Sequence, residues 1–199
     1  GLSYRQNVGF LHNPPRPLQN LDTLKLPRRD ARIWNGYLFS GKGVDMVETS
    51  RGCTMTCNFC SMNRMYGRTF RTYRFERIMQ DLANAKKYGA KYITFSDDNI
   101  TLNVQRFESL CDAIVEAGHN DLRYIVQAST SGIASSPALA QKMKRAGIQI
   151  AFLGIENVSE KNLKIMNKGN MLEKTKKAIE YLHNNNILIV GGMIIGHAE

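Results

Sequence analysis

The sequence lacks the features that mark membrane, secreted and disordered proteins. None of its apolar runs approaches the roughly 18–20 residues that a membrane-spanning helix needs, and no signal-peptide pattern opens it. Like charges never gather in a block of five, although 27 basic and 17 acidic residues give a formal net charge of +10. Basic charge favours anionic partners, but charge spread in this way is typical of a solvated surface. We expect a globular protein of the cytoplasm.

Proline is scarce, and four of its five copies fall in the segments 13–17 and 26–30. Proline fixes φ and biases the preceding residue away from helix. Residues 1–36 are therefore predicted to form an extended arm or inter-domain linker, and residues 37–199 a single domain. Four spaced leucines predict that the arm lies against a surface: Leu18, Leu21, Leu24 and Leu26. The chain begins without Met and stops after an apolar run, so we expect part of a longer protein.

From about residue 44 the sequence alternates strand and helix patterns. Strands are expected at 44–49, 91–96, 123–128, 149–155 and 187–195, and helices begin near residues 75, 104 and 136. Two shorter helices are expected at about 159–167 and 172–185. This alternation predicts βαβ units and a parallel α/β sheet. A doubly wound sheet and a barrel both fit it. Five βα units with no sign of a reversal in strand order favour a partial parallel barrel, truncated after about five βα units.

Cysteine is scarce too, but three of the four copies crowd into the loop after the first expected strand: Cys53, Cys57 and Cys60. In a chain without secretory features such crowding indicates metal or redox chemistry, not disulfides. A short loop of this spacing wraps three thiolates around one inorganic centre, and leaves one iron of a 4Fe–4S cluster without a protein ligand. Structural zinc stays an alternative, although it would want a fourth ligand. Cys111 falls on the apolar stripe of an expected helix, which is typical of a buried cysteine.

The spacing of the three cysteines, with Phe59 directly before the last, resembles the radical S-adenosylmethionine (SAM) superfamily. Further agreements lie at the ends of the second, fourth and fifth expected strands, at 96–99, 154–157 and 192–199. Within the superfamily the chain looks most like the cobalamin-associated group, which includes anaerobic magnesium-protoporphyrin monomethyl ester oxidative cyclases and several methyltransferases. Residues 21–27 resemble the linker from their cobalamin-binding domain. That upstream domain is absent from this sequence, as is the sixth strand of the superfamily's partial barrel.

The resemblance implies that Cys53, Cys57 and Cys60 hold a 4Fe–4S cluster whose open iron chelates SAM. Reductive cleavage of SAM would give a 5′-deoxyadenosyl radical that takes a hydrogen atom from the substrate. Functional groups of a barrel collect where its strands end. The expected contacts with SAM are therefore Phe59, Asp97, Asp98, Asn99, Gln127, Ser129, Glu156, Gly192, Ile194, Gly196 and Glu199. Residues 97–99 are expected to act chiefly through backbone, and the two glycines at 192 and 196 to let the adenine approach closely.

The resemblance leaves the reaction open. The first hypothesis is an oxidative cyclase-like enzyme acting on a small molecule such as an anionic tetrapyrrole. The second is a methyltransferase or methylthiotransferase acting on RNA, protein or a small metabolite, although no basic run with interleaved aromatics indicates RNA binding. The third is a structural metal-binding module without activity. Both enzyme hypotheses imply an electron donor such as flavodoxin or ferredoxin. They also allow for cobalamin bound by an upstream domain.

Overall fold

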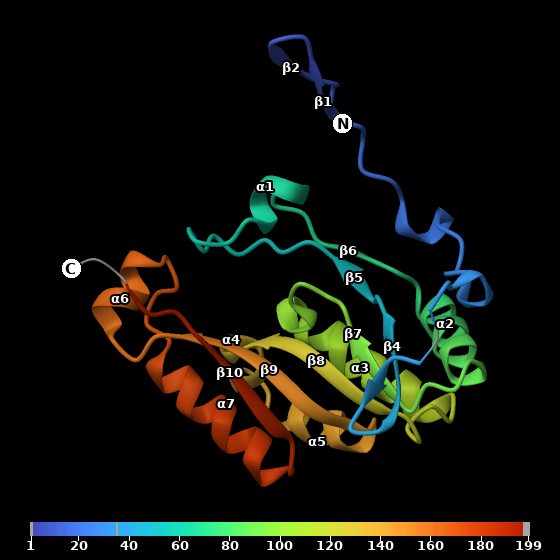
Figure 1. Ribbon diagram of the computed structural model, residues 1–199. Coiled ribbons are helices and arrows are strands. Elements are labelled where there is room, and N and C mark those ends of the chain that lie inside the picture. Colours follow the sequence, from blue (N-terminus) through green and yellow to red (C-terminus); the bar gives the residue numbers. More distant parts are fainter. Residues whose placement is uncertain (1, 35, 197–199) are drawn as a thin grey trace.

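The centre of the molecule is a curved six-stranded sheet, seen in a computed structural model that describes residues 2–34 and 36–196 (Figure 1). Five strands run parallel and lie side by side in chain order: β4 (Lys42–Val47), β7 (Tyr92–Phe95), β8 (Arg123–Ser129), β9 (Ile148–Glu156) and β10 (Leu188–Met193). The short strand β3 (Leu38–Phe39) adds antiparallel to β4. Since the described strands nowhere reverse their order, the sheet is the predicted partial barrel and not a doubly wound sheet.

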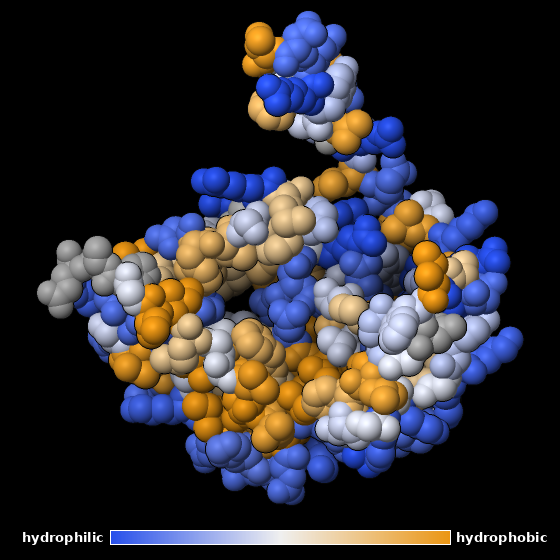
Figure 2. Space-filling view, in the orientation of Figure 1, coloured by the Kyte–Doolittle hydropathy of each residue, from blue (hydrophilic) through white to orange (hydrophobic). Residues whose placement is uncertain are grey.

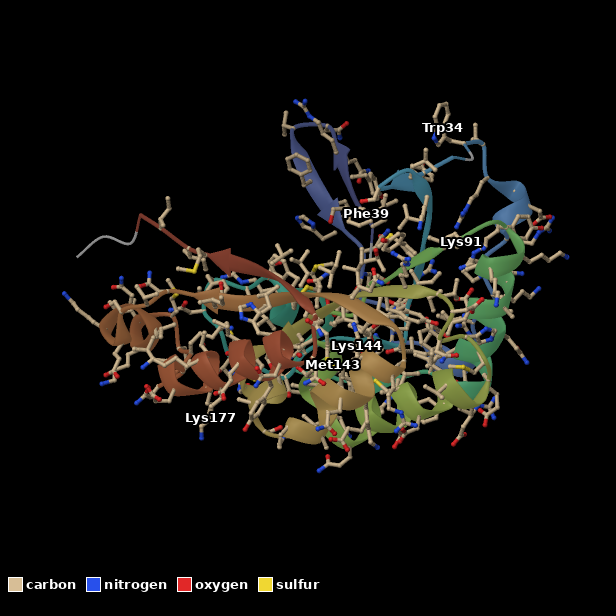
Figure 3. The ribbon with its side chains drawn as sticks, turned by 90° about the horizontal axis from the view of Figure 1, so that it is seen from below. Trp34, Phe39, Lys91, Met143, Lys144 and Lys177 are labelled. Atoms are coloured by element: carbon tan, nitrogen blue, oxygen red, sulfur yellow. The ribbon has the colours of Figure 1, made fainter. Side chains whose placement is uncertain are left out.

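Four helices in the crossovers pack on the outer face of this sheet: α2 (Phe75–Lys87), α3 (Val104–Glu116), α5 (Pro137–Arg145) and α7 (Leu172–Asn184). Each buries one apolar stripe. Met143 of α5 is fully buried, whereas Lys177 of α7 points into solvent (Figure 3). Ser136 caps α5 by accepting from the amide of Leu139 at 3.2 Å, which explains why the helix begins there. No helix in the described part of the chain is both long and apolar enough to span a membrane.

The concave face of the sheet is lined in layers that the strand register fixes. The middle layer runs across five strands through Met46, Thr94, Ile125, Ile150 and Leu188. The next layer toward the carboxyl ends holds Gln127, Phe152 and Val190, and the last holds Ser129, Gly154 and Gly192. Two residues of this last layer are glycines and the third is a serine. Little side-chain volume therefore fills the barrel at the edge where the functional groups were expected.

Several short elements are absent from the sequence prediction. The arm contains an antiparallel hairpin, β1 (Ser3–Gln6) with β2 (Gly9–His12), which projects away from the barrel (Figure 1). It also has single 3-10 turns at Leu21–Thr23 and Arg29–Ala31, and a third turn, Ile100–Leu102, follows β7. The remaining additions are β5 (Ser50–Arg51), α1 (Met62–Tyr66), β6 (Arg71–Thr72) and α4 (Thr130–Ala134), whereas α6 (Glu160–Ile165) is the short helix predicted at 159–167.

The second half of the arm lies against the barrel. Leu21 is 2% exposed and belongs to the main core, and Leu24 packs against that core. Arg29 is buried between β4 and α2, where its guanidinium donates to Asp45 at 2.7 Å and to Asp81 at 2.5 Å. The contact that the spaced leucines predicted is thus made by Leu21 and Leu24, whereas Leu18 is exposed.

Candidate functional site

A cavity of about 160 Å³ opens at the carboxyl ends of the strands, beneath the cysteine loop, which we define as residues 52–61. Figure 2 shows the molecule hollowed between this loop and the body of the sheet. The loop and the ends of β7, β8 and β9 all contribute to its wall. The lining residues are Cys53, Met55, Cys57, Phe59, Cys60, Met62, Asp98, Asn99, Gln127, Ala128, Ser129, Phe152, Gly154, Glu156 and Lys168.

The three crowded cysteines all line this cavity as free thiols. Cys57 is buried, Cys53 is half-buried and Cys60 is exposed. Burial raises the pKa of the Cys57 thiol, and the positive charge of Lys168 acts in the opposite direction. Cys111 lies on the buried face of α3, as predicted, and burial raises the pKa of its thiol strongly.

The three thiols around the cavity supply the donors that an iron–sulfur cluster takes. Within residues 2–34 and 36–196, no three His, Cys, Asp or Glu side chains are close enough to share one metal ion. A zinc site needs that convergence. An iron–sulfur cluster does not, because each thiolate binds a different iron and the sulfurs stay further apart. Three thiols around one cavity match the number of protein ligands expected for a 4Fe–4S cluster with one open iron.

The entry to the cysteine loop is fixed by Gly52. Its φ is +90°, and a Cβ at this position would collide with the carbonyl oxygen of Thr69. The Gly52 amide donates to the Asp98 carboxylate at 2.7 Å. Only glycine meets both conditions without strain, so the loop starts in a conformation that the end of β7 holds in place.

The three polar residues after β7 have different environments. Asp97 is fully buried and does not line the cavity: it accepts hydrogen bonds from the Thr49 amide at 3.1 Å, the Thr49 hydroxyl at 2.6 Å and the Ser50 hydroxyl. Burial raises the pKa of Asp97 despite these donors. Asp98 and Asn99 do line the cavity. Residues 97–99 therefore connect Thr49 and Ser50, which precede the cysteine loop, to the cavity wall.

Gln127 and Ser129 both line the cavity from β8, on the face predicted for them. Ser129 has a second role that the sequence did not indicate. Its hydroxyl lies 3.0 Å from the Thr101 hydroxyl and accepts from the Gly132 amide at 3.1 Å. Ser129 is thus the N-cap of α4 as well as part of the wall.

Glu156 ends β9 with a φ of +66°, a left-handed conformation that is uncommon outside glycine. Its carboxylate lies 3.1 Å from the ammonium of Lys168, and the two side chains are only 13% and 11% exposed. Lys168 was not predicted from the sequence, because it follows α6 and only the tertiary fold brings it to the cavity. The pair places one carboxylate and one ammonium in the wall of the cavity.

The glycine-containing strand β10 stands apart from the cavity wall. Gly192 lies against the Phe152 ring, the Ile194 amide donates to the Glu156 carbonyl at 2.7 Å, and Gly196 is exposed with a φ of +84°. None of these three residues lines the cavity as the structure describes it. Glu199 lies outside the described residues. Phe59, the remaining predicted contact, is in the wall and 44% exposed.

Comparisons with known proteins agree on one family. The model of the radical SAM superfamily matches residues 47–199. An uncharacterized methyltransferase of Pyrococcus horikoshii is 32% identical over 201 residues, covering 100% of this chain and 43% of that protein. The anaerobic magnesium-protoporphyrin IX monomethyl ester cyclase of Synechocystis is 25% identical, covering 100% of this chain and 40% of that protein. The chain thus spans about two-fifths of the length of these relatives.

A solved structure has the same fold. The radical SAM methyltransferase TsrM from Kitasatospora setae, with cobalamin and a [4Fe–4S] cluster bound, superposes with a TM-score of 0.70 at 17% identity. The match covers 77% of this chain and 31% of that one. At this identity the likeness extends to the fold alone.

Proposed function

The chain belongs to the radical SAM superfamily, and from this membership we propose that Cys53, Cys57 and Cys60 bind a 4Fe–4S cluster whose open iron takes up SAM. One observation carries the proposal: the three thiols share a cavity with the polar groups that end β7, β8 and β9. When bound, the cluster supplies the electron that reductively cleaves SAM. The protein's own part is to hold three thiolates in one cavity and to limit the access of water.

The wall of the cavity suits the polar half of SAM. Its methionine moiety carries an ammonium and a carboxylate, and Glu156 and Lys168 offer one charge of each sign in a partly dry site. Gln127 and Ser129 add polar groups, and Asp98 and Asn99 complete the wall with the backbone of residues 97–99. We assign the adenine to Phe59 and the end of β10, through Gly192, Ile194, Gly196 and Glu199.

The substrate we propose is a small, largely apolar molecule that lies on the concave face. Phe152 is 39% exposed there, Val190 45% and Leu188 61%, next to the cavity and in continuous layers. An exposed apolar surface of this kind marks a binding site more often than chance. A tetrapyrrole fits this chemistry, and the similarity to magnesium-protoporphyrin cyclases supports it.

Two reactions remain for that substrate, and each has support. Hydrogen abstraction leading to oxidative cyclisation is supported by the cyclase relatives. Methyl transfer is supported by the 32% identical relative that is named as a methyltransferase. Cobalamin, which TsrM binds, would be held by an upstream domain outside this chain.

The cluster assignment is tested by iron binding. After anaerobic reconstitution we expect about four irons per chain in the wild type and in Cys111→Ala. With reductant and SAM, both should release 5′-deoxyadenosine. Cys57→Ala should lose most of the iron, because a buried thiol of the ligand set is gone. Full iron content in that variant would refute the assignment.

The two reactions are distinguished by isotopes. The purified, reconstituted protein is incubated anaerobically with a reductant, magnesium-protoporphyrin IX monomethyl ester, cobalamin and SAM carrying a CD₃ group. Transfer of the CD₃ group to the product establishes methylation, whereas a product that has lost hydrogen without gaining the label establishes hydrogen abstraction. Release of 5′-deoxyadenosine without any change of the porphyrin would reject the tetrapyrrole and retain the radical chemistry.

An acidic flavodoxin or ferredoxin is the electron donor that the surface favours. The net charge is +10, and Arg64 and Arg68 are exposed next to the cysteine loop. Opposite charge accelerates association and is screened by salt. Reduction by such a donor should slow steeply between about 50 and 300 mM salt, because screening shortens the range of the attraction. Free thiols and this donor together favour a reducing, cytoplasmic location.

A further inference from the structure

The cysteine loop is held from outside by a turn more than 100 residues further along the chain. We call residues 165–168, from the last residue of α6 onward, the clamp turn. The amide of Asn58 donates to the Met166 carbonyl at 3.3 Å, and its side-chain amide donates to the Ile165 carbonyl at 2.5 Å. In the opposite direction, the side-chain amide of Asn167 donates to the Thr56 carbonyl at 2.8 Å and the Thr56 hydroxyl at 2.7 Å. These bonds lie on both sides of Cys57.

The clamp turn is itself firmly anchored. Leu163 and Met166 are buried at 1% and 0% exposure, and the Lys168 amide closes the helix end on the Leu163 carbonyl at 2.9 Å. Asn167 has a φ of +58°, a left-handed position that asparagine tolerates better than most residues. By contrast, the described chain has no helix or strand between Arg51 and Met62. The turn is therefore the rigid partner, and the cysteine loop is the segment that is held.

We propose that the clamp turn positions the cysteine loop for its cluster, with Asn167 as the positioning residue. The proposal rests on the function proposed above for the three cysteines. By fixing Thr56 and Asn58, the turn keeps the intervening Cys57 facing the cavity. Groups that orient metal ligands commonly change metal retention when they are removed, although they never touch the metal.

The same turn joins the two halves of the site. Lys168 follows Asn167 directly and pairs with Glu156 at the end of β9. One anchored turn therefore supports both the loop that carries the thiols and the charged pair in the cavity wall. A change of the Asn167 side chain should act first on cluster retention, because its side-chain hydrogen bonds go to Thr56 in the cysteine loop.

The test is the rate at which the reconstituted protein loses iron to a chelator. Asn167→Gly accepts the left-handed backbone and removes both side-chain hydrogen bonds. We expect iron loss at least roughly ten-fold faster than in the wild type. The electron paramagnetic resonance signal of the reduced cluster should also broaden, because a looser loop holds the cluster in several geometries. Asn186→Gly is the matched control, since Asn186 also has a positive φ of +53° but lies exposed after α7.

A second pair of variants tests the contact from the other side. Thr56→Val removes the hydroxyl that accepts from Asn167, and should accelerate iron loss, whereas Thr56→Ser keeps the hydroxyl and should retain the wild-type rate. Melting temperatures of the iron-free proteins should agree among the variants. Iron loss from Asn167→Gly at the wild-type rate would overturn the proposal. Absence of a cluster from the wild type would instead overturn the proposed function.

Discussion

Arg29 shows how one side chain ties the arm to the barrel. It is 2% exposed, and its guanidinium meets two carboxylates, Asp45 on β4 and Asp81 on α2, and the carbonyl of Met46. Burial disfavours the charge on Asp45, but hydrogen bonds from Arg32 and Arg29 outweigh it and lower the pKa of that carboxyl. Asp45 is therefore ionised at neutral pH, opposite the Arg29 guanidinium.

Removing the cation should destabilise the fold. In Arg29→Met the buried Asp81 loses its ion-pair partner and Asp45 keeps only Arg32, and breaking a buried pair in this way typically costs about 3–5 kcal/mol. Chemical denaturation should therefore show a much lower midpoint than the wild type.

Arg28→Met is the control, because the neighbouring Arg28 pairs with Asp30 at the surface, where its side chain is 78% exposed. Surface pairs contribute little, so its midpoint should match the wild type. Equal midpoints for both variants would mean that the buried cluster does not fasten the arm.

At the scale of elements, strand β10 tests the assignment of the adenine. Gly192 faces the concave side beside Gly154 and Phe152, whereas Gly191 faces the outer side toward Ile155. Gly192→Val would introduce a branched side chain at the open end of the barrel. The added methyl groups would stand where we assign the adenine, and a steric conflict of about 1–3 kcal/mol there should lower the affinity for SAM roughly ten-fold, with iron content unchanged.

The same strand supplies the control for this prediction. Gly191→Ala adds its methyl group on the outer side, where the end of the Ile155 side chain has to move slightly. Isothermal titration with SAM should give wild-type affinity for it. Equal affinity in Gly192→Val as well would remove β10 from the SAM site.

The long elements were predictable from sequence because local signals agree with the fold. Helix α5 has Ser136 and Pro137 at its start, and the apolar periodicity of the helices matches the stripe each one buries. Short elements were not predictable. Helix α4, for example, is five residues long and exists because Ser129 caps it and Gly132 packs closely on Thr101. Such elements depend on tertiary partners that no local window contains.

The site residues, like the elements, were predictable from the sequence only in part. Cysteine spacing and strand ends identified Cys53, Cys57, Cys60 and most of the polar wall. Asp97 resembled a ligand contact in the sequence, yet its side chain faces Thr49 and Ser50 inside the protein. Asn167 and Lys168 carry no local signal, because their partners Thr56 and Glu156 are brought to them only by the fold.

At the scale of the whole molecule, the barrel is open along one side. Within the described residues β10 pairs with β9 alone, and Leu188, Val190 and Met193 are each at least 45% exposed. An unpaired apolar edge promotes association. We expect the 199-residue chain to form dimers or larger species at micromolar concentration in sedimentation velocity.

Val190→Lys should shift this chain toward monomer, because a charge on an edge strand opposes pairing with another strand. Ile33→Lys is the control, since Ile33 is fully exposed in the arm, away from β10. If both variants sediment like the parent chain, the association does not use this edge.

The distance between the cysteine loop and its clamp turn has a consequence during synthesis. Thr56 and Asn167 are 111 residues apart, and ribosomes add roughly 5–20 residues per second. For about 5–20 s the nascent chain therefore carries three closely spaced thiols without the clamp turn that holds Thr56. In that interval they are open to oxidation, to mispairing and to capture of the wrong metal. For the cluster proposed above, low oxygen and delivery of iron and sulfide after synthesis of α6 should therefore improve assembly.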